Sequence, residues 1–240
     1  MKIWQLSFEL DDYDNLVPIK EFTVEEIQSF DGRSHLRQWK PVQVKRMEPE
    51  KGLELSDAPG FTIPVFSRRA WECLEPLISK NVEILPLDFN EKEYLGINVI
   101  TVLDAIDYEK SIYKTYRDGK RIMAFKKYVF LPTVIENVSM FKILDEKTRY
   151  AFVSDEFKQT VEKNNLLGFK FKLVWDSENE YSMYIDRWKR DVSLLGEKSI
   201  PHGEGGGLWW YRRRKRFSAS ARVGASCIAI TLGMYGAEVM

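Results

Sequence analysis

The chain has 240 residues, of which 44% are hydrophobic and 13% aromatic, so it can bury a substantial core and is not an intrinsically disordered protein. Lysine plus arginine and aspartate plus glutamate number 36 each, so the net charge is zero. This balance excludes the overall attraction to polyanions that strongly basic chains show, and we expect no nucleic-acid partner.

The first predicted element is a strand over residues 2–10, where polar and apolar side chains alternate. The face expected toward the core comprises Trp4, Leu6, Phe8 and Leu10. Thr23 and Glu26 have the spacing of a capping box, which predicts a short helix that reaches Phe30. The N-terminal part therefore combines a strand with a short helix.

The middle of the chain is predicted to continue with strands over residues 42–46, 82–87 and 94–100. Ser67 is a suitable N-cap for a helix that reaches residue 78, because apolar side chains follow it at helical spacing. Thr101 and Asp104 repeat the capping-box pattern and predict another short helix through Ile106.

The remaining predicted strands cover residues 121–131, 140–143, 150–153 and 169–175, with a helix capped by Ser154 before the last of them. One face of the last strand comprises Phe169, Phe171, Leu173 and Trp175. The helices fall between groups of strands instead of after every strand. This order predicts an α+β fold with a mixed or antiparallel sheet and a few short helices.

Composition changes abruptly near residue 200, so we predict a domain over residues 1–199 and a poorly ordered extension over residues 200–240. The extension contains a glycine-rich linker, a basic cluster and an uncharged run of 15 residues over 223–237. That run is shorter than the roughly 20 residues of a membrane-spanning helix, which argues against membrane attachment. Two cysteines and a start without a signal-peptide pattern favour the cytoplasm.

No nucleophile elbow, phosphate-binding loop or dinucleotide fingerprint occurs in the sequence, and we expect no catalytic residue and no cofactor. The histidines, His35 and His202, are far apart, which predicts no metal site, and His35 is expected in an exposed loop. Asp104 and Asp107 could share a helix face, so a small enzyme that uses these surface carboxylates stays an alternative, as does a membrane-tethered regulator.

An ordered set of short blocks covers residues 39–175. These blocks are Trp39-x-Pro41, Asp57-Ala58-Pro59-Gly60-Phe61, Val65-Phe66-Ser67 with Ala70 and Leu74, Glu83-Ile84-Leu85-Pro86-Leu87, Asn98-Val99-x-x-Val102-Leu103-Asp104-Ala105-x-Asp107 with Lys110-Ser111, Phe141-Lys142-Ile143, Phe152-Val153-Ser154-Asp155-Glu156-Phe157, and Leu167-Gly168-Phe169-x-Phe171 with Trp175. Their order resembles family eleven of the numbered immunity-protein families of polymorphic toxin systems. The resemblance implies an α+β domain without enzyme activity that protects its bacterial producer by binding a cognate toxin.

Charge indicates where such a partner could bind. The first 31 residues carry eight acidic and two basic side chains, a net charge of −6. A basic toxin would be steered to this stretch. The partner-binding residues that we predict are Asp11, Asp12, Asp14, Glu25 and Glu26. The alternative interpretation of the stretch is a solvated surface without a partner.

Overall fold

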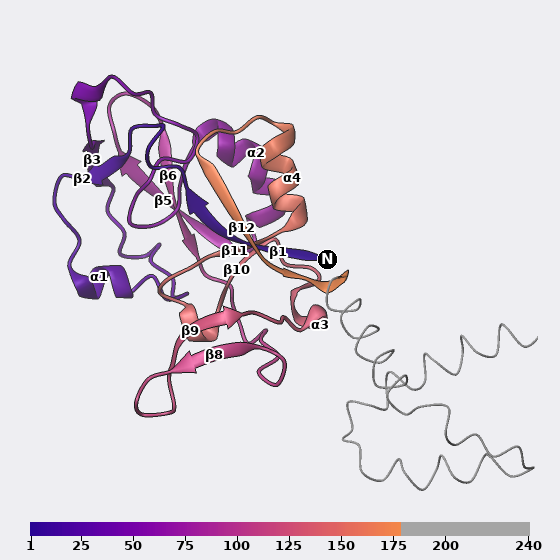
Figure 1. The fold of residues 1–240 in the computed structure, drawn as a ribbon. Helices are drawn as coiled ribbons and strands as arrows, with labels where there is room; N and C mark the ends of the chain where they lie inside the picture. Colours follow the sequence, from indigo (N-terminus) through magenta and orange to yellow (C-terminus); the bar gives the residue numbers. More distant parts are fainter. Residues whose placement is uncertain (179–240) are drawn as a thin grey trace, which may run out of the picture. The chain divides into compact units, whose positions relative to one another are not determined.

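The structure is a computed structural model, and it describes residues 1–178. Two five-stranded mixed sheets, a separate two-stranded hairpin and four short helices make up this part of the chain (Figure 1). The predicted α+β class is therefore confirmed. The predicted domain boundary at residue 199 and the predicted extension over residues 200–240 lie outside the described residues.

The first sheet has the strand order β12-β1-β11-β10-β7. Its strands are β1 (Lys2–Phe8), β7 (Val102–Leu103), β10 (Met140–Ile143), β11 (Phe152–Ser154) and β12 (Phe169–Asp176). β1 pairs antiparallel with both β11 and β12, so the first strand of the chain lies between the last two strands described. β7 joins the sheet by parallel pairing with β10.

The second sheet has the order β2-β3-β5-β6-β4. Its strands are β2 (Leu16–Pro18), β3 (Val42–Arg46), β4 (Val65–Ser67), β5 (Val82–Asp88) and β6 (Tyr94–Val99). The hairpin pairs β8 (Ile112–Thr115) with β9 (Ile122–Lys127). The helices are α1 (Val24–Gln28), α2 (Arg68–Ile78), α3 (Pro132–Ile135) and α4 (Asp155–Lys163), and single 3₁₀ turns occupy Pro49–Lys51 and Leu144–Glu146.

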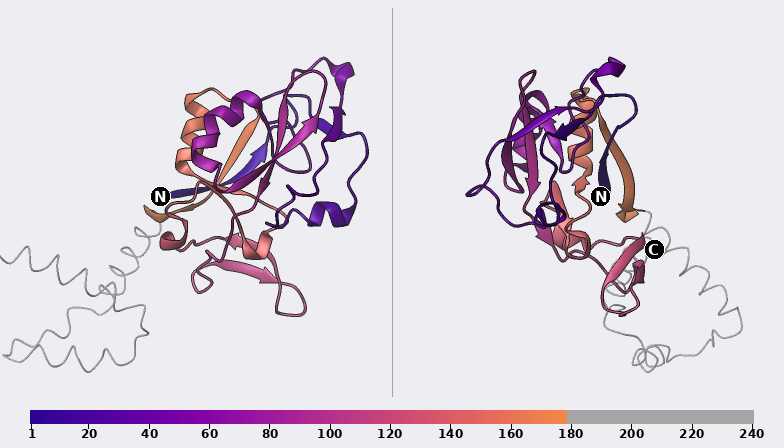
Figure 2. Two further views of the ribbon diagram at one scale, coloured as in Figure 1. Left: turned by 180° about the vertical axis from the view of Figure 1, so that it is seen from behind. Right: turned by 90° about the vertical axis from the view of Figure 1, so that its left-hand side faces the viewer.

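One supersecondary unit occurs twice. In the first copy, α2 connects the parallel strands β4 and β5, and the antiparallel strand β6 lies between them. In the second copy, α4 connects β11 and β12 around β1. Each helix begins after a serine N-cap, Ser67 or Ser154, whose side chain accepts a hydrogen bond from the third residue of its helix. Both predicted caps are thus confirmed, and the two helices pack against each other (Figures 1 and 2).

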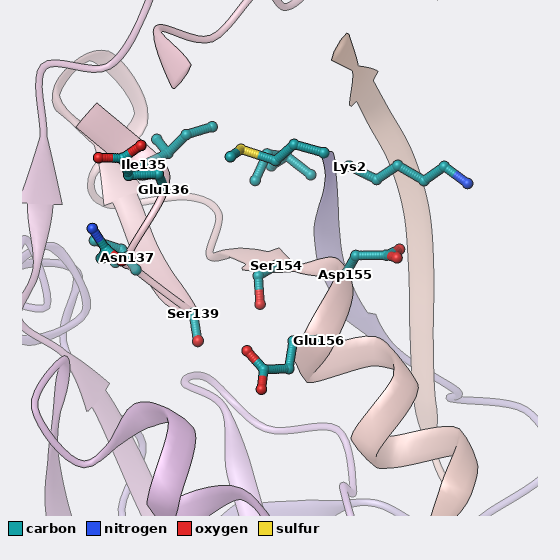
Figure 3. Close-up of a pocket in the computed structure, with 11 residues that line it drawn as sticks. Lys2, Ile135, Glu136, Asn137, Ser139, Ser154, Asp155 and Glu156 are labelled. Carbon is teal, nitrogen blue, oxygen red and sulfur yellow. The ribbon is translucent and has the colours of Figure 1, made fainter. Parts of the chain in front are cut away.

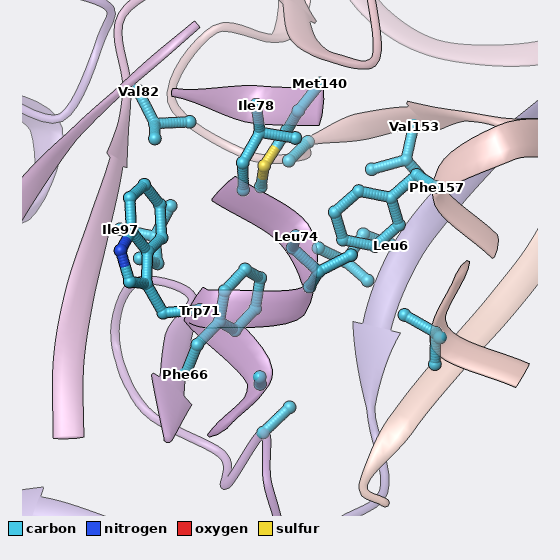
Figure 4. Close-up of a cluster of buried hydrophobic side chains, with 14 of the residues drawn as sticks. Leu6, Phe66, Trp71, Leu74, Ile78, Val82, Ile97, Met140, Val153 and Phe157 are labelled. Atoms are coloured by element: carbon cyan, nitrogen blue, oxygen red, sulfur yellow. The ribbon is translucent and has the colours of Figure 1, made fainter. Parts of the chain in front are cut away.

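The main core lies where α2 and α4 meet the two sheets (Figure 4). Helical spacing places Trp71, Leu74 and Ile78 on the buried face of α2. Phe157 of α4 is fully buried beside Phe66, with ring centroids 6.4 Å apart. Burial of this apolar surface, which comes from both repeated units, is the main contribution to the stability of the folded state.

A second core covers the other face of the first sheet. Because of it, the faces predicted for β1 and β12 are partly wrong. Ile3, predicted on the polar side of its strand, is 1% exposed and packs in this second core. The register shifts between Ile3 and Trp4 opposite β12, which is the effect of a bulge. As a result Trp175 joins the second core, whereas Phe169 and Phe171 pack against the main core.

A buried aspartate joins the two repeated units. Asp57 accepts hydrogen bonds from the Ser67 hydroxyl (2.8 Å) at the start of α2 and from the Leu167 amide (3.0 Å) after α4. Arg69 pairs with the same carboxylate and also donates to backbone carbonyls at the end of α4. Gly168 completes the junction in the left-handed region (φ +87°), where a Cβ atom would lie 2.1 Å from a side-chain oxygen.

The predicted helix after Thr101 is wrong. Residues 102–103 instead form β7, and Ile106 makes an isolated antiparallel bridge with Phe130. Parallel pairing with β10 and burial of Ala105 and Ile106 in the second core outweigh the weak local capping pattern. Strand structure predicted over residues 121–131 is present as β9, which ends at Lys127.

Candidate functional site

The acidic residues of the N-terminal stretch do not form one open surface. Asp14 is 2% exposed, and its carboxylate accepts hydrogen bonds from Arg46 (2.9 Å) and from the Glu48 amide (3.0 Å). Although burial acts to raise it, these hydrogen bonds hold the pKa of Asp14 below its ordinary value. The sequence predicts Asp14 on a partner-binding surface, but its carboxylate is buried. It connects the loop after β1 to β3.

Basic residues outside the first 31 positions pair with further acids of this stretch. Lys170 lies 2.5 Å from Glu9, and Asp31 pairs with both Arg33 (2.8 Å) and Lys147 (3.2 Å). Hydrogen bonding from Arg33, opposed by burial and aided by Lys147, lowers the pKa of Asp31 to about 2. The net charge of −6 counted along the sequence therefore overstates the negative potential of the folded surface.

Asp11 and Asp12 are exposed, as the sequence predicts, and their charges act on Lys170. Glu25 and Glu26 lie in the exposed first turn of α1, where Glu26 completes the predicted capping box with Thr23. The structure therefore leaves four of the five predicted carboxylates at the surface, in two separate segments.

Helix α1 also exposes apolar side chains to solvent. It has no buried residue, and Val24 and Ile27 are exposed beside its acidic first turn. Exposed Ile19 and Leu36 lie in the segments before and after it. Several apolar side chains exposed beside charged ones could contribute apolar contacts to a protein partner. We call Ile19–Leu36 the α1 surface.

Buried polar groups hold the loop that follows α1. Glu83 of β5 accepts hydrogen bonds from the His35 amide (2.9 Å) and from Asn98 of β6 (3.1 Å). His35 is buried against Phe30, so its predicted exposure is wrong. Lys142 of β10 donates to the Phe30 carbonyl, and its burial lowers the pKa of the amine to about 8. These contacts fix the α1 surface to three strands of the two sheets.

The hairpin is a feature that the sequence analysis did not predict. Residues 108–127, which we call the basic hairpin, carry seven lysines and arginines and two acids, a net charge of +5. All four residues of β8 are exposed, and both strands lie outside the two large sheets. A local signal is present in the sequence, because Lys114 and Arg117 lie among Ile112, Tyr113 and Tyr116.

The basic hairpin is anchored by a chain of aromatic rings. Tyr113 contacts Phe125 across the strands, with ring centroids 5.7 Å apart, and Phe125 stacks on Tyr128 at 4.8 Å. Tyr128 in turn contacts Phe152 in the second core. Burial and a hydrogen bond to Glu146 raise the pKa of the Tyr128 hydroxyl. This packing fixes the base of the hairpin to the first sheet.

A surface cavity of about 370 Å³ lies between the start of β1, the segment after α3 and the first turn of α4 (Figure 3). Glu136, Asp155 and Glu156 contribute carboxylates to its lining. Asp155 is already engaged, since it accepts hydrogen bonds from Trp4 (2.9 Å) and Gln159 (2.8 Å). Within residues 1–178 no group of three or more histidine, cysteine or acidic residues is arranged to hold a metal ion.

The carboxylates of the enzyme alternative do not share a helix face. Asp104 is exposed and lies 3.5 Å from the Tyr108 hydroxyl, whereas Asp107 pairs with Lys110 at 2.7 Å. The Tyr108 hydroxyl also donates to Asp145 (2.7 Å). In the part of the chain that the structure describes, no helix has the length and apolar character needed to cross a membrane. The predicted tail, with its uncharged run over 223–237, is outside that part.

The chain matches a known protein family. Residues 25–176, well over half of the chain, match the family described as Immunity protein family (Imm11). The matched range begins in α1 and ends at the last residue of β12, so it includes the α1 surface from Glu25 onward and the whole basic hairpin. No curated protein matches the chain.

Proposed function

Because the chain belongs to the Imm11 immunity protein family, we propose that it binds a cognate bacterial toxin and neutralises it by protein–protein contact. The family match over residues 25–176 carries this proposal. In this mechanism the protein performs no chemical step, and occupation of a toxin surface in the cytoplasm of the producing cell is sufficient for protection.

The structure supports binding through an exposed surface. On the α1 surface, Val24 and Ile27 can contribute apolar contacts beside the carboxylates of Glu25 and Glu26. We propose that these carboxylates, together with Asp11 and Asp12, attract basic groups of the toxin during association. Asp14 is omitted from this contact because its carboxylate is buried and paired.

Protection by the chain can be measured directly. We expect that expression of the toxin domain from the reading frame next to its gene arrests growth of a host cell, and that co-expression of the chain restores growth. The purified proteins should then elute together from a size-exclusion column. A toxin domain from an unrelated system is the control. Persistent growth arrest with abundant chain and no complex would contradict the proposed function.

The acidic contact has its own prediction. Replacing Asp11 and Asp12 by lysine should slow association with the toxin about tenfold at low salt, with little effect on dissociation, because exposed charges act mainly on encounter. Stopped-flow mixing across a range of salt concentrations measures both rates. The matched control is E72K/E75K, which makes the same charge change on exposed positions of α2. Equal association rates for the two variants would remove Asp11 and Asp12 from the contact.

A further inference from the structure

The basic hairpin is the most prominent feature of the described residues that the fold itself does not require. It forms a sheet of two strands only, apart from both large sheets. Figures 1 and 2 show it projecting from the end of the described body that faces away from α2 and α4, the end toward which α1 also lies. Two-stranded ribbons contribute little stability by themselves, so a projecting one is available for another role.

The side chains of the hairpin combine charge with apolar anchors. Ile112 is 54% exposed and Met123 is 41% exposed, one on each strand. Lys114 and Lys120 are exposed on the first strand and at the turn. Tyrosine, methionine and arginine are enriched at the centres of protein interfaces, and large side chains held in place provide contact area at little cost in entropy.

The tip of the hairpin is ordered before any partner arrives. Asp118 accepts hydrogen bonds from the Lys120 amide (2.9 Å) and from the Arg121 side chain (2.8 Å). The Arg121 guanidinium lies over the Tyr116 ring at 5.0 Å, and Arg149 donates to the Tyr116 hydroxyl (3.2 Å). Asp118 is thus paired within the turn, while Lys114, Arg117 and Lys120 are exposed.

From this geometry we propose that the basic hairpin is a toxin-contact surface that recognises an acidic, partly apolar face of the cognate toxin. The inference rests on the proposed function and adds the position and the chemistry of the contact. Ile112 and Met123 enter apolar hollows of that face, and Lys114 and Lys120 pair with its carboxylates. The hairpin determines the lifetime of the complex, while Asp11, Asp12 and the carboxylates of α1 act on its formation.

A protein face fits this surface better than a nucleic acid does. A basic two-stranded ribbon can enter the major groove of DNA. Here, however, Asp104, Glu109 and Asp145 are exposed around the base of the hairpin, where they would repel phosphates. Exposed isoleucine and methionine also give no advantage against a phosphate backbone.

Two independent variants test the hairpin, because one change alone could disturb folding. I112S/M123S removes the apolar anchors, and K114E/K120E reverses two charges. Each should raise the Kd for the purified toxin domain at least about a hundredfold, mainly through faster dissociation, as expected for central contacts. Calorimetric titration gives Kd, and thermal unfolding verifies that each variant is folded.

Matched controls change equivalent exposed positions elsewhere. L167S/L173S removes two exposed leucines, and K80E/K172E makes the same charge change. Weaker binding for the hairpin variants alone supports the proposal. Wild-type affinity in both folded hairpin variants overturns it while leaving the proposed function intact. No binding and no protection by the unaltered chain overturns the proposed function itself. Hairpin-dependent binding of a short DNA duplex at physiological salt, without hairpin-dependent toxin binding, would overturn the assignment to a protein partner.

Discussion

Replacing Phe157 by alanine is expected to lower the free energy of unfolding by about 4 kcal/mol, the upper part of the range for large-to-small changes in a core. The ring is fully buried and contacts Phe66, Phe169 and Phe171. Its loss would leave a cavity between the two repeated units, where strands on both sides limit collapse. Urea denaturation followed by tryptophan fluorescence measures the change.

A suitable control for this prediction is Leu173→Ala on β12. Leu173 is 42% exposed, so its truncation should cost less than about 1 kcal/mol. If Phe157→Ala were no more destabilising than Leu173→Ala, the packing of α4 described above would be incorrect.

Replacing Asp57 by alanine should lower the free energy of unfolding by about 3 kcal/mol, the upper end expected for hydrogen bonds to a charged group. The Leu167 amide and the Arg69 guanidinium lose their shared acceptor, and the Ser67 hydroxyl loses its partner. Both repeated units are affected at once, because this carboxylate joins the start of α2 to the turn after α4. Chemical denaturation at neutral pH measures the loss.

Two further variants define the source of this effect. Asp57→Asn keeps one acceptor oxygen and should give an intermediate loss, since its amide nitrogen cannot accept from the Leu167 amide. Glu162→Ala removes an exposed carboxylate that pairs with Lys158, and it should cost less than about 1 kcal/mol. Stability of Asp57→Ala within 1 kcal/mol of the unaltered chain would contradict the role given to Asp57 here.

Elements defined by local chemistry could be predicted from the sequence. The caps at Thr23, Ser67 and Ser154 depend on side chains that accept a hydrogen bond from the amide three residues further on, so their signatures lie within a few positions. The periodic face of α2 is equally local. The short strands β2 and β4 were missed because three residues are too few to show a period.

Features set by distant partners could not be predicted. The burial of Ile3 depends on a second core supplied by residues 105–152, and the position of Trp175 depends on a bulge opposite β1. The acidic stretch shows the same limit for the candidate site. The acids are evident in the sequence, but Arg46, which pairs with Asp14, and Lys147, the second partner of Asp31, lie 32 and 116 positions further along the chain than these aspartates.

Strand β1 has a consequence for synthesis. It emerges from the ribosome well before both of its neighbours, β11 and β12, which are the last two strands described. The second sheet draws all its strands from residues 16–99 and can assemble earlier. During translation both edges of β1 therefore stay unpaired until β11 has emerged, and one of them until β12 has emerged. Unpaired strand edges of this kind are sites for chaperone binding and for premature aggregation.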